Sequence, residues 1–221
     1  MMSEKTIGVV LAGCGFLDGA EVHEAVLTLL ALDRAGVTVK CMAPNVAQMH
    51  VVDHTSQTPA KGEGRNVLQE SARIARCEIT DIAEVNAGEL DALVFPGGFG
   101  AAKNLCTFAV DGPACSVNPD VDRLIKAMHG AGKPQGFICI APAIAAKVLG
   151  ELNPVLTIGT DESTAAALGA LGAKHQNCNV DEIAVDEANK IASTPAYMLG
   201  PSIAHVAKGI DKCISQVLAW A

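Results

Sequence analysis

One of the eight cysteines, Cys139, stands between a short apolar run and a proline, and this placement gives it the character of a nucleophile. Residues 136–138 are apolar and of strand type. Pro142 falls in the first turn of a predicted helix, where its missing N–H costs nothing. A side chain at such a sharp strand-to-helix turn lies beside the free N–H groups of the helix. We expect this position to favour the thiolate of Cys139 over the thiol and to support nucleophilic catalysis.

Paired glycines follow another predicted strand, which spans residues 91–96. Gly97 and Gly98 let the backbone approach a ligand closely and turn its N–H groups inward. Together with the N–H of Ile140, these groups would form an oxyanion hole. The alternative interpretation is a tight turn without a ligand. The loop lacks the spacing of a phosphate-binding loop, which argues against a nucleotide site.

The third candidate is Glu24, early in a predicted helix over residues 20–35. A carboxyl group buried among Ala and Val side chains has a raised pKa and stays protonated. Glu24 would then donate a hydrogen bond to Cys139 or transfer a proton during catalysis. The alternative is an ordinary solvated glutamate in a first turn, and Glu21, one turn earlier, competes for the same role. His23 is adjacent and faces elsewhere on the helix.

Strands that alternate with helices predict the framework that positions these residues. We expect strands at residues 6–12, 37–43, 91–96, 136–138, 155–158, 182–185 and 190–192. We expect helices at residues 20–35, 65–76, 119–131, 140–149, 162–171 and 201–220. Asp18 or Gly19 is expected to cap the first helix, and residues 44–64 form a polar excursion with room for a small hairpin. The predicted fold is a doubly wound, mostly parallel α/β sheet with helices on both faces, in one domain over residues 1–221.

Ligands of such sheets bind beyond the carboxyl ends of the strands. The loops at residues 13–19, 97–104 and 159–162 are therefore expected to converge on Cys139. The candidate substrate-binding residues are Gly13, Cys14, Gly97, Gly98, Asn104, Ile140 and Thr160.

The amino-acid composition limits the classes of protein to which the chain can belong. The chain has 221 residues, of which 50% are apolar and 3% aromatic, and its formal net charge is −8. The charges form no basic stripe, which argues against a nucleic-acid partner. No apolar run reaches about 18 residues, so we expect no membrane span. The residues before the first strand have no signal-peptide character, and we expect a cytoplasmic protein.

The cysteines are scattered without a CxxC pair, at positions 14, 41, 77, 106, 115, 139, 178 and 213. This spacing is not typical of a disulfide framework or of a zinc site, and no histidine pair has zinc-ligand spacing. We therefore expect no metal and mostly inert, buried thiols in a reducing compartment.

At these residues the chain resembles the ThiJ/PfpI superfamily, also called class I glutamine amidotransferase-like, over essentially its whole length. Within it the chain resembles the ElbB family, named for enhancing lycopene biosynthesis and labelled isoprenoid biosynthesis glyoxalase. The stretches that carry the resemblance are residues 8–15, 18–26, 96–105, 136–142, 157–161 and 194–198.

The resemblance implies a nucleophile at Cys139, an acid at Glu24, and oxyanion N–H groups near Gly98 and Ile140. It implies a glutathione-independent glyoxalase without a cofactor, which converts a small 2-oxoaldehyde such as glyoxal to a 2-hydroxy acid such as glycolate. It also raises deglycase action on adducts of these aldehydes. The chain departs from many relatives at residues 159–161, where it has no histidine. This departure disfavours PfpI-like proteolysis, because cleavage of an amide needs an acid for the leaving amine.

Three interpretations stay open on the sequence. The chain is a cysteine-dependent glyoxalase, an amidase or peptidase, or a non-enzymatic redox sensor or interaction protein in which Cys139 is oxidised. We also expect a homodimer, by analogy with the superfamily.

Overall fold

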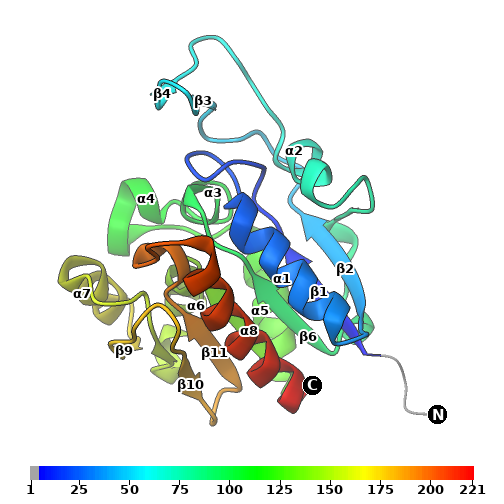
Figure 1. Cartoon of the computed structure of the whole chain (residues 1–221), viewed down its shortest axis with the longest axis vertical. Helices are drawn as coiled ribbons and strands as arrows, with labels where there is room; N and C mark the ends of the chain where they lie inside the picture. The colour runs from blue at the N-terminus through cyan, green and yellow to red at the C-terminus, as the bar shows by residue number, and fades with distance from the viewer. Residues whose placement is uncertain (1–4) are drawn as a thin grey trace.

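The computed structural model describes residues 5–221, which fold around a seven-stranded sheet (Figure 1). The strand order is β10 (Ala184–Asp186), β11 (Ile191–Thr194), β7 (Gln135–Ile138), β6 (Ala92–Phe95), β1 (Thr6–Val10), β2 (Thr38–Ala43) and β5 (Thr80–Asp81). All neighbours are parallel except β10 and β11, which are antiparallel. This arrangement confirms the predicted α/β class.

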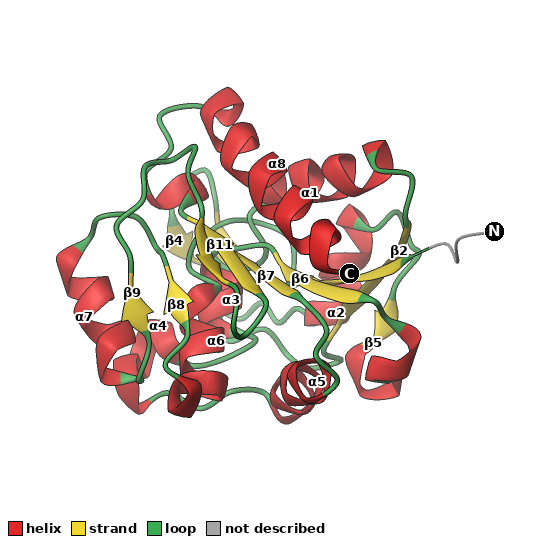
Figure 2. Cartoon of the chain, turned by 90° about the horizontal axis from the view of Figure 1, so that it is seen from below, coloured by secondary structure: helices red, strands yellow, loops and turns green. Residues whose placement is uncertain are grey.

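Helices cover both faces of the sheet. In Figure 2, α1 (Val22–Arg34) and α8 (Ile203–Trp220) lie on one face, while α5 (Pro119–Gly130) and α6 (Pro142–Leu149) lie on the other. The other helices are α2 (Val67–Ile74), α3 (Phe99–Lys103), α4 (Phe108–Asp111) and α7 (Glu162–Ala170). Short 3₁₀ turns occur at Ile82–Glu84, Ala87–Glu89, Gly112–Ala114, Gly150–Leu152 and Ala196–Met198.

The central strands are buried on both faces, as expected for parallel strands between two helical layers. Every residue of β6 and β7 is buried. Phe95 and Phe137 occupy facing positions on these two strands, and their rings stack with centroids 4.9 Å apart. This stack fixes β6 against β7 immediately before the two loops that follow them.

Two small sheets lie outside the main one. The excursion contains a hairpin of β3 (Val52–Asp53) and β4 (Thr58–Pro59), which projects from the body in Figure 1. The strand expected at residues 155–158 is shortened to β8 (Val155–Leu156), and it pairs with β9 (Lys174–His175) instead of entering the main sheet. β8 is excluded from a place beside β7 in the main sheet, because β11 already occupies that edge of β7.

The first helix is capped differently from our prediction. Its N-cap is Glu21, whose Oε2 accepts the N–H of Glu24 at 2.7 Å. Asp18 is buried instead, and its Oδ2 accepts the N–H of Val52 at 2.7 Å. The helix therefore starts later than the residues that we expected to cap it, and Gly19 lies in the preceding loop.

Within residues 5–221, no helix is both long and apolar enough to cross a bilayer. The expectation about a signal peptide concerns residues that, apart from Lys5, lie outside the described part of the chain.

Candidate active site

Cys139 occupies a strained turn between β7 and α6. Its φ is +62°, in the left-handed region that side chains with a Cβ seldom adopt. Its N–H donates to the carbonyl of Thr194 at 2.9 Å, so the end of β11 braces the turn. The side chain is 7% exposed. The turn therefore has the form predicted for a nucleophile, and its side chain is almost entirely buried.

Glu24 lies in the first turn of α1 and is completely buried. Its Oε2 accepts the N–H of Gly97 at 3.0 Å, and its Oε1 accepts the N–H of Tyr197 at 3.1 Å. A further hydrogen bond joins its carboxyl group to the thiol of Cys139. The structure thus brings Glu24, rather than Glu21, into contact with Cys139.

The protonation of this pair follows from its burial. Burial raises the pKa of Glu24 from 4.5 to about 8, against the lowering effect of its backbone hydrogen bonds. This confirms the expected protonated carboxyl group. Burial, and then the charge of Glu24, also raise the pKa of the Cys139 thiol well above its usual range. The expectation of a lowered thiol pKa is therefore wrong, because desolvation outweighs the N–H groups beside the sulfur.

The loop after β6 packs directly against this pair. A Cβ at Gly97 would clash with Cβ of Cys139 and would lie 2.6 Å from Oε2 of Glu24. Gly98 has a φ of +94°, and its N–H and that of Ile140 form hydrogen bonds with the Cys139 thiol. An oxyanion on a carbon bonded to this sulfur would lie near the same two N–H groups.

Three further candidates lie in a neighbouring cluster of loops. The Asn104 side chain donates to the carbonyls of Ala12 and Asp18, both at 2.8 Å, and accepts the N–H of Met49 at 3.0 Å. Gly13 donates its N–H to Ser71 Oγ at 2.8 Å. The pKa of Cys14 is raised by burial and by the charge of Glu70. These contacts hold the loops together, and none of them reaches the Cys139 thiol.

Thr160 is exposed in the loop after β8. In that loop, a Cβ at Gly159 would lie 2.8 Å from the Leu199 side chain. His175 on β9 accepts the N–H of Ile158 at 3.2 Å. Within residues 5–221, no hydrogen bond joins a histidine to Cys139 or Glu24. In the described part of the chain, therefore, no histidine is directly hydrogen-bonded to the pair, and a role for Thr160 stays a prediction.

Tyr197 is a site residue to which the sequence analysis assigned no role. Besides its N–H bond to Glu24, its phenol oxygen lies 2.8 Å from Nδ1 of His23, which is exposed. It is the one tyrosine of the chain, three residues after a buried strand that ends in Thr194. This position after a buried strand is the feature of the sequence that points to a role for Tyr197 at the site.

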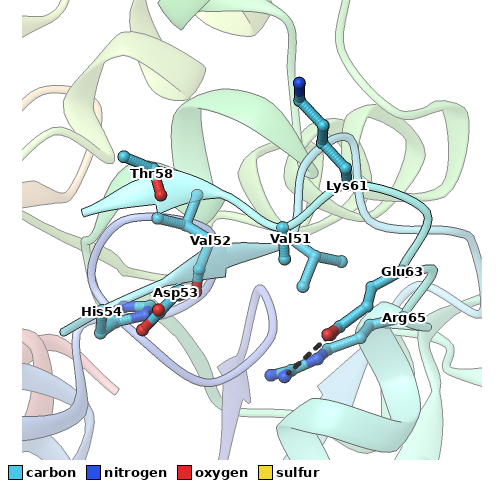
Figure 3. Close-up of a pocket in the computed structure, with 9 residues that line it drawn as sticks. Val51, Val52, Asp53, His54, Thr58, Lys61, Glu63 and Arg65 are labelled. Atoms are coloured by element: carbon cyan, nitrogen blue, oxygen red, sulfur yellow. Dashed lines mark hydrogen bonds and ion pairs between the residues drawn. The ribbon is translucent and has the colours of Figure 1, made fainter. Parts of the chain in front are cut away.

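A separate cavity of about 520 Å³ lies beside the β3–β4 hairpin (Figure 3). Its lining residues are Val51, Val52, Asp53, His54, Thr58, Ala60, Lys61, Glu63 and Arg65. The lining comes from one segment and contains no member of the Cys139 cluster. Residues 5–221 contain no group of three or more His, Cys, Asp or Glu side chains arranged to hold a metal ion.

Comparisons with known proteins place the chain among amidotransferase-like proteins. No protein-family model matches it. Human glutamine amidotransferase-like class 1 domain-containing protein 3, named as mitochondrial, is 50% identical over 221 residues, which cover 96% of this chain and 82% of that protein. An Ehrlichia chaffeensis isoprenoid biosynthesis protein with an amidotransferase-like domain has a crystal structure with a TM-score of 0.91, at 39% identity over 98% of this chain and 99% of that one. A ThiJ/PfpI domain protein from Brachyspira murdochii shares the fold, with a TM-score of 0.59 at 16% identity over 98% of each chain.

Proposed function

The chain belongs to the family of glutamine amidotransferase-like class 1 domain proteins, and we propose that within it the protein is a glutathione-independent glyoxalase of the ElbB type. The proposed substrate is glyoxal or a similar small 2-oxoaldehyde, and the product is the 2-hydroxy acid. Cys139 serves as nucleophile and Glu24 as the acid and base.

One observation carries the proposal: the buried carboxyl group of Glu24 is hydrogen-bonded to the Cys139 thiol, and its pKa is raised to about 8. A general base works best when its pKa lies near the pH of the reaction. Near neutral pH, Glu24 is protonated in most molecules and ionised in a minority, so it can both give and take a proton. The low exposure of both side chains suits a small substrate.

The proposed reaction needs one nucleophile and one proton carrier. The Cys139 sulfur bonds to one carbonyl carbon of glyoxal, and the thiol proton passes through Glu24 to the carbonyl oxygen, which gives a hemithioacetal. Glu24 then removes the C–H proton from that carbon and protonates the oxygen of the neighbouring carbon, which gives an enediol. Glu24 next takes the proton of the original hydroxyl group and delivers it to the neighbouring carbon, which gives a thioester of glycolate. Water cleaves the C–S bond, releases glycolate and restores the thiol. One carbon is oxidised while the other is reduced, so no external oxidant or reductant is needed.

The N–H groups of Gly98 and Ile140 would stabilise the negative oxygen in the addition and hydrolysis steps. Amidase or peptidase chemistry is less well supported, because no histidine is hydrogen-bonded to Cys139 in residues 5–221. A redox sensor is also less well supported, because a buried thiol with a raised pKa is a poor target for oxidants.

The test is glycolate formation from glyoxal by purified protein, followed by chromatography. We expect turnover by the wild type and none by Cys139→Ala. We expect Glu24→Gln to lower turnover by about 10²–10⁴-fold, the usual contribution of a positioned acid or base. Glu21→Gln is the matched control, because the amide oxygen can still cap α1. Equal turnover by the wild type and Cys139→Ala would refute the proposal.

Two further parts of the proposal concern the state of the protein. We propose a homodimer, supported by an apolar stripe on α1 in which Val22, Val26 and Leu30 are 37%, 49% and 37% exposed. A monomer mass in light scattering at micromolar concentration would contradict it. We propose the cytoplasm as the compartment, supported by eight free cysteines. The human relative is named as mitochondrial, and cell fractionation distinguishes the two compartments.

A further inference from the structure

A second strained turn follows β11, next to the turn that carries Cys139. Ala196 is completely buried and has a φ of +44°. Such a conformation costs about 1–2 kcal/mol for a residue with a Cβ, so the surrounding contacts must enforce it. Because β11 lies beside β7 in the sheet, both strained turns open at the same edge. Tyr197 directly follows Ala196 in this second turn.

Tyr197 contacts two consecutive residues of α1 with different groups. Its main-chain N–H donates to Oε1 of Glu24 at 3.1 Å. Its phenol oxygen lies 2.8 Å from Nδ1 of His23, and the two rings have centroids 5.7 Å apart. Consecutive residues of a helix point about 100° apart. The two contacts therefore hold Tyr197 to α1 from two directions.

From this geometry we infer that Tyr197 and His23 form a clamp that positions the carboxyl group of Glu24 against Cys139. The side-chain contact, at the surface, fixes the place of Tyr197. The main-chain N–H of Tyr197, at the interior, then fixes Oε1 of Glu24. Both are positioning residues, and their part in catalysis rests on the proposed function of Glu24.

The clamp has a consequence that can be measured on Glu24 itself. An N–H donor stabilises the ionised carboxylate, and that of Tyr197 is the leading influence that lowers the pKa of Glu24. The other groups that face Glu24 are Glu21 on its own helix, Cys139 and the N–H of Gly97. A substitution that loosens the clamp weakens only the hydrogen bond from the N–H of Tyr197 to Glu24, so the pKa of Glu24 should rise.

The experiment is a ¹³C NMR titration of carboxyl-labelled protein, with the Glu24 signal assigned by its absence in Glu24→Gln. We expect Tyr197→Phe and His23→Ala each to raise the midpoint by about 0.5–1 pH unit, part of the value of a hydrogen bond to a charged group. The double variant should show no larger rise than the greater single one, because both remove the same contact. His23→Gln, which restores an acceptor, should recover part of the difference.

His205→Ala is the matched control. It removes a contact of the same length, 2.8 Å between Nδ1 of His205 and Oγ of Ser202, at the start of α8. We expect its Glu24 midpoint to equal that of the wild type. Unchanged midpoints in both single variants, a fall, or additive shifts in the double variant would overturn the clamp. The titration needs no aldehyde, so a protein that fails to turn over glyoxal still tests the clamp, and a working glyoxalase with unmoved midpoints refutes the clamp alone.

Discussion

The raised pKa of Glu24 makes the stability of the protein depend on pH in a predictable direction. In the folded chain the pKa is about 8, whereas an exposed glutamate has a value of 4.5. The folded state therefore holds a proton that the unfolded state gives up more readily. The contribution of this group to stability is complete below pH 4.5 and is lost as the pH rises toward 8.

The size of the effect follows from the two pKa values. Each pH unit between them is worth about 1.4 kcal/mol. The interval from 4.5 to about 8 thus corresponds to about 5 kcal/mol in total. Over the practical range from about pH 5 to about pH 8, the loss should be about 3–4 kcal/mol. This loss is a large share of the stability of a typical domain.

Urea unfolding at a series of pH values, on the wild type and Glu24→Gln, measures this loss. The amide cannot accept both the Gly97 and Tyr197 N–H bonds, so the variant should be less stable at low pH. Its stability should nevertheless lack the decline that Glu24 causes. Other titrating groups, such as His175, whose pKa is lowered by burial, are common to both proteins and cancel in the difference. Parallel pH profiles of the two proteins would refute the reasoning.

Two more outcomes follow from the same cluster. Gly97→Ala should lower the free energy of unfolding by about 2–3 kcal/mol, because the new Cβ meets Cys139 and Glu24. Gly169→Ala in α7, whose new Cβ meets no atom within 4 Å, should instead raise the free energy of unfolding by about 0.5–1 kcal/mol. A comparable loss of stability in both variants would refute the packing argument. Alkylation by iodoacetamide, followed by mass spectrometry, should be slower at Cys139 than at the exposed Cys77 at pH 6 and should rise steeply as Glu24 loses its proton. Fast labelling of Cys139 at pH 6 would contradict the raised thiol pKa.

The fold was predictable because its elements are strongly patterned. The alternation of apolar strands and helices predicted the parallel sheet. The polar excursion was expected to have room for the hairpin of β3 and β4, and strands were expected near β10 and β11 without a predicted direction. The short elements were not predicted. Strand β5 has two residues, and α3 and α4 have five and four. Segments of this length carry too little periodicity to stand out from loops.

The predictable parts of the site are those in which one or two residues indicate the local backbone structure around them. A cysteine between a strand and a proline indicates a strand-to-helix turn, and paired glycines indicate a close approach. The contact between Glu24 and Cys139 depends on how α1 lies over the sheet, which the sequence does not state. The role of Tyr197 was missed for the same reason, since its N–H reaches Glu24 from 173 residues away.

The sign of the Cys139 pKa shift shows why local pattern is a poor guide to electrostatics. The turn before α6 does supply N–H groups to the sulfur, as the sequence indicated. Burial of the thiol beside a carboxyl group acts in the opposite direction and is larger, and neither burial nor that neighbour is local in the chain. A thiol that stays protonated in the resting protein needs a base at the moment of attack. Glu24, with a pKa of about 8, is that base. The environment that makes Cys139 a weak nucleophile at rest is therefore the one that makes Glu24 an effective proton carrier, and the two properties should change together in any variant that opens the site to water.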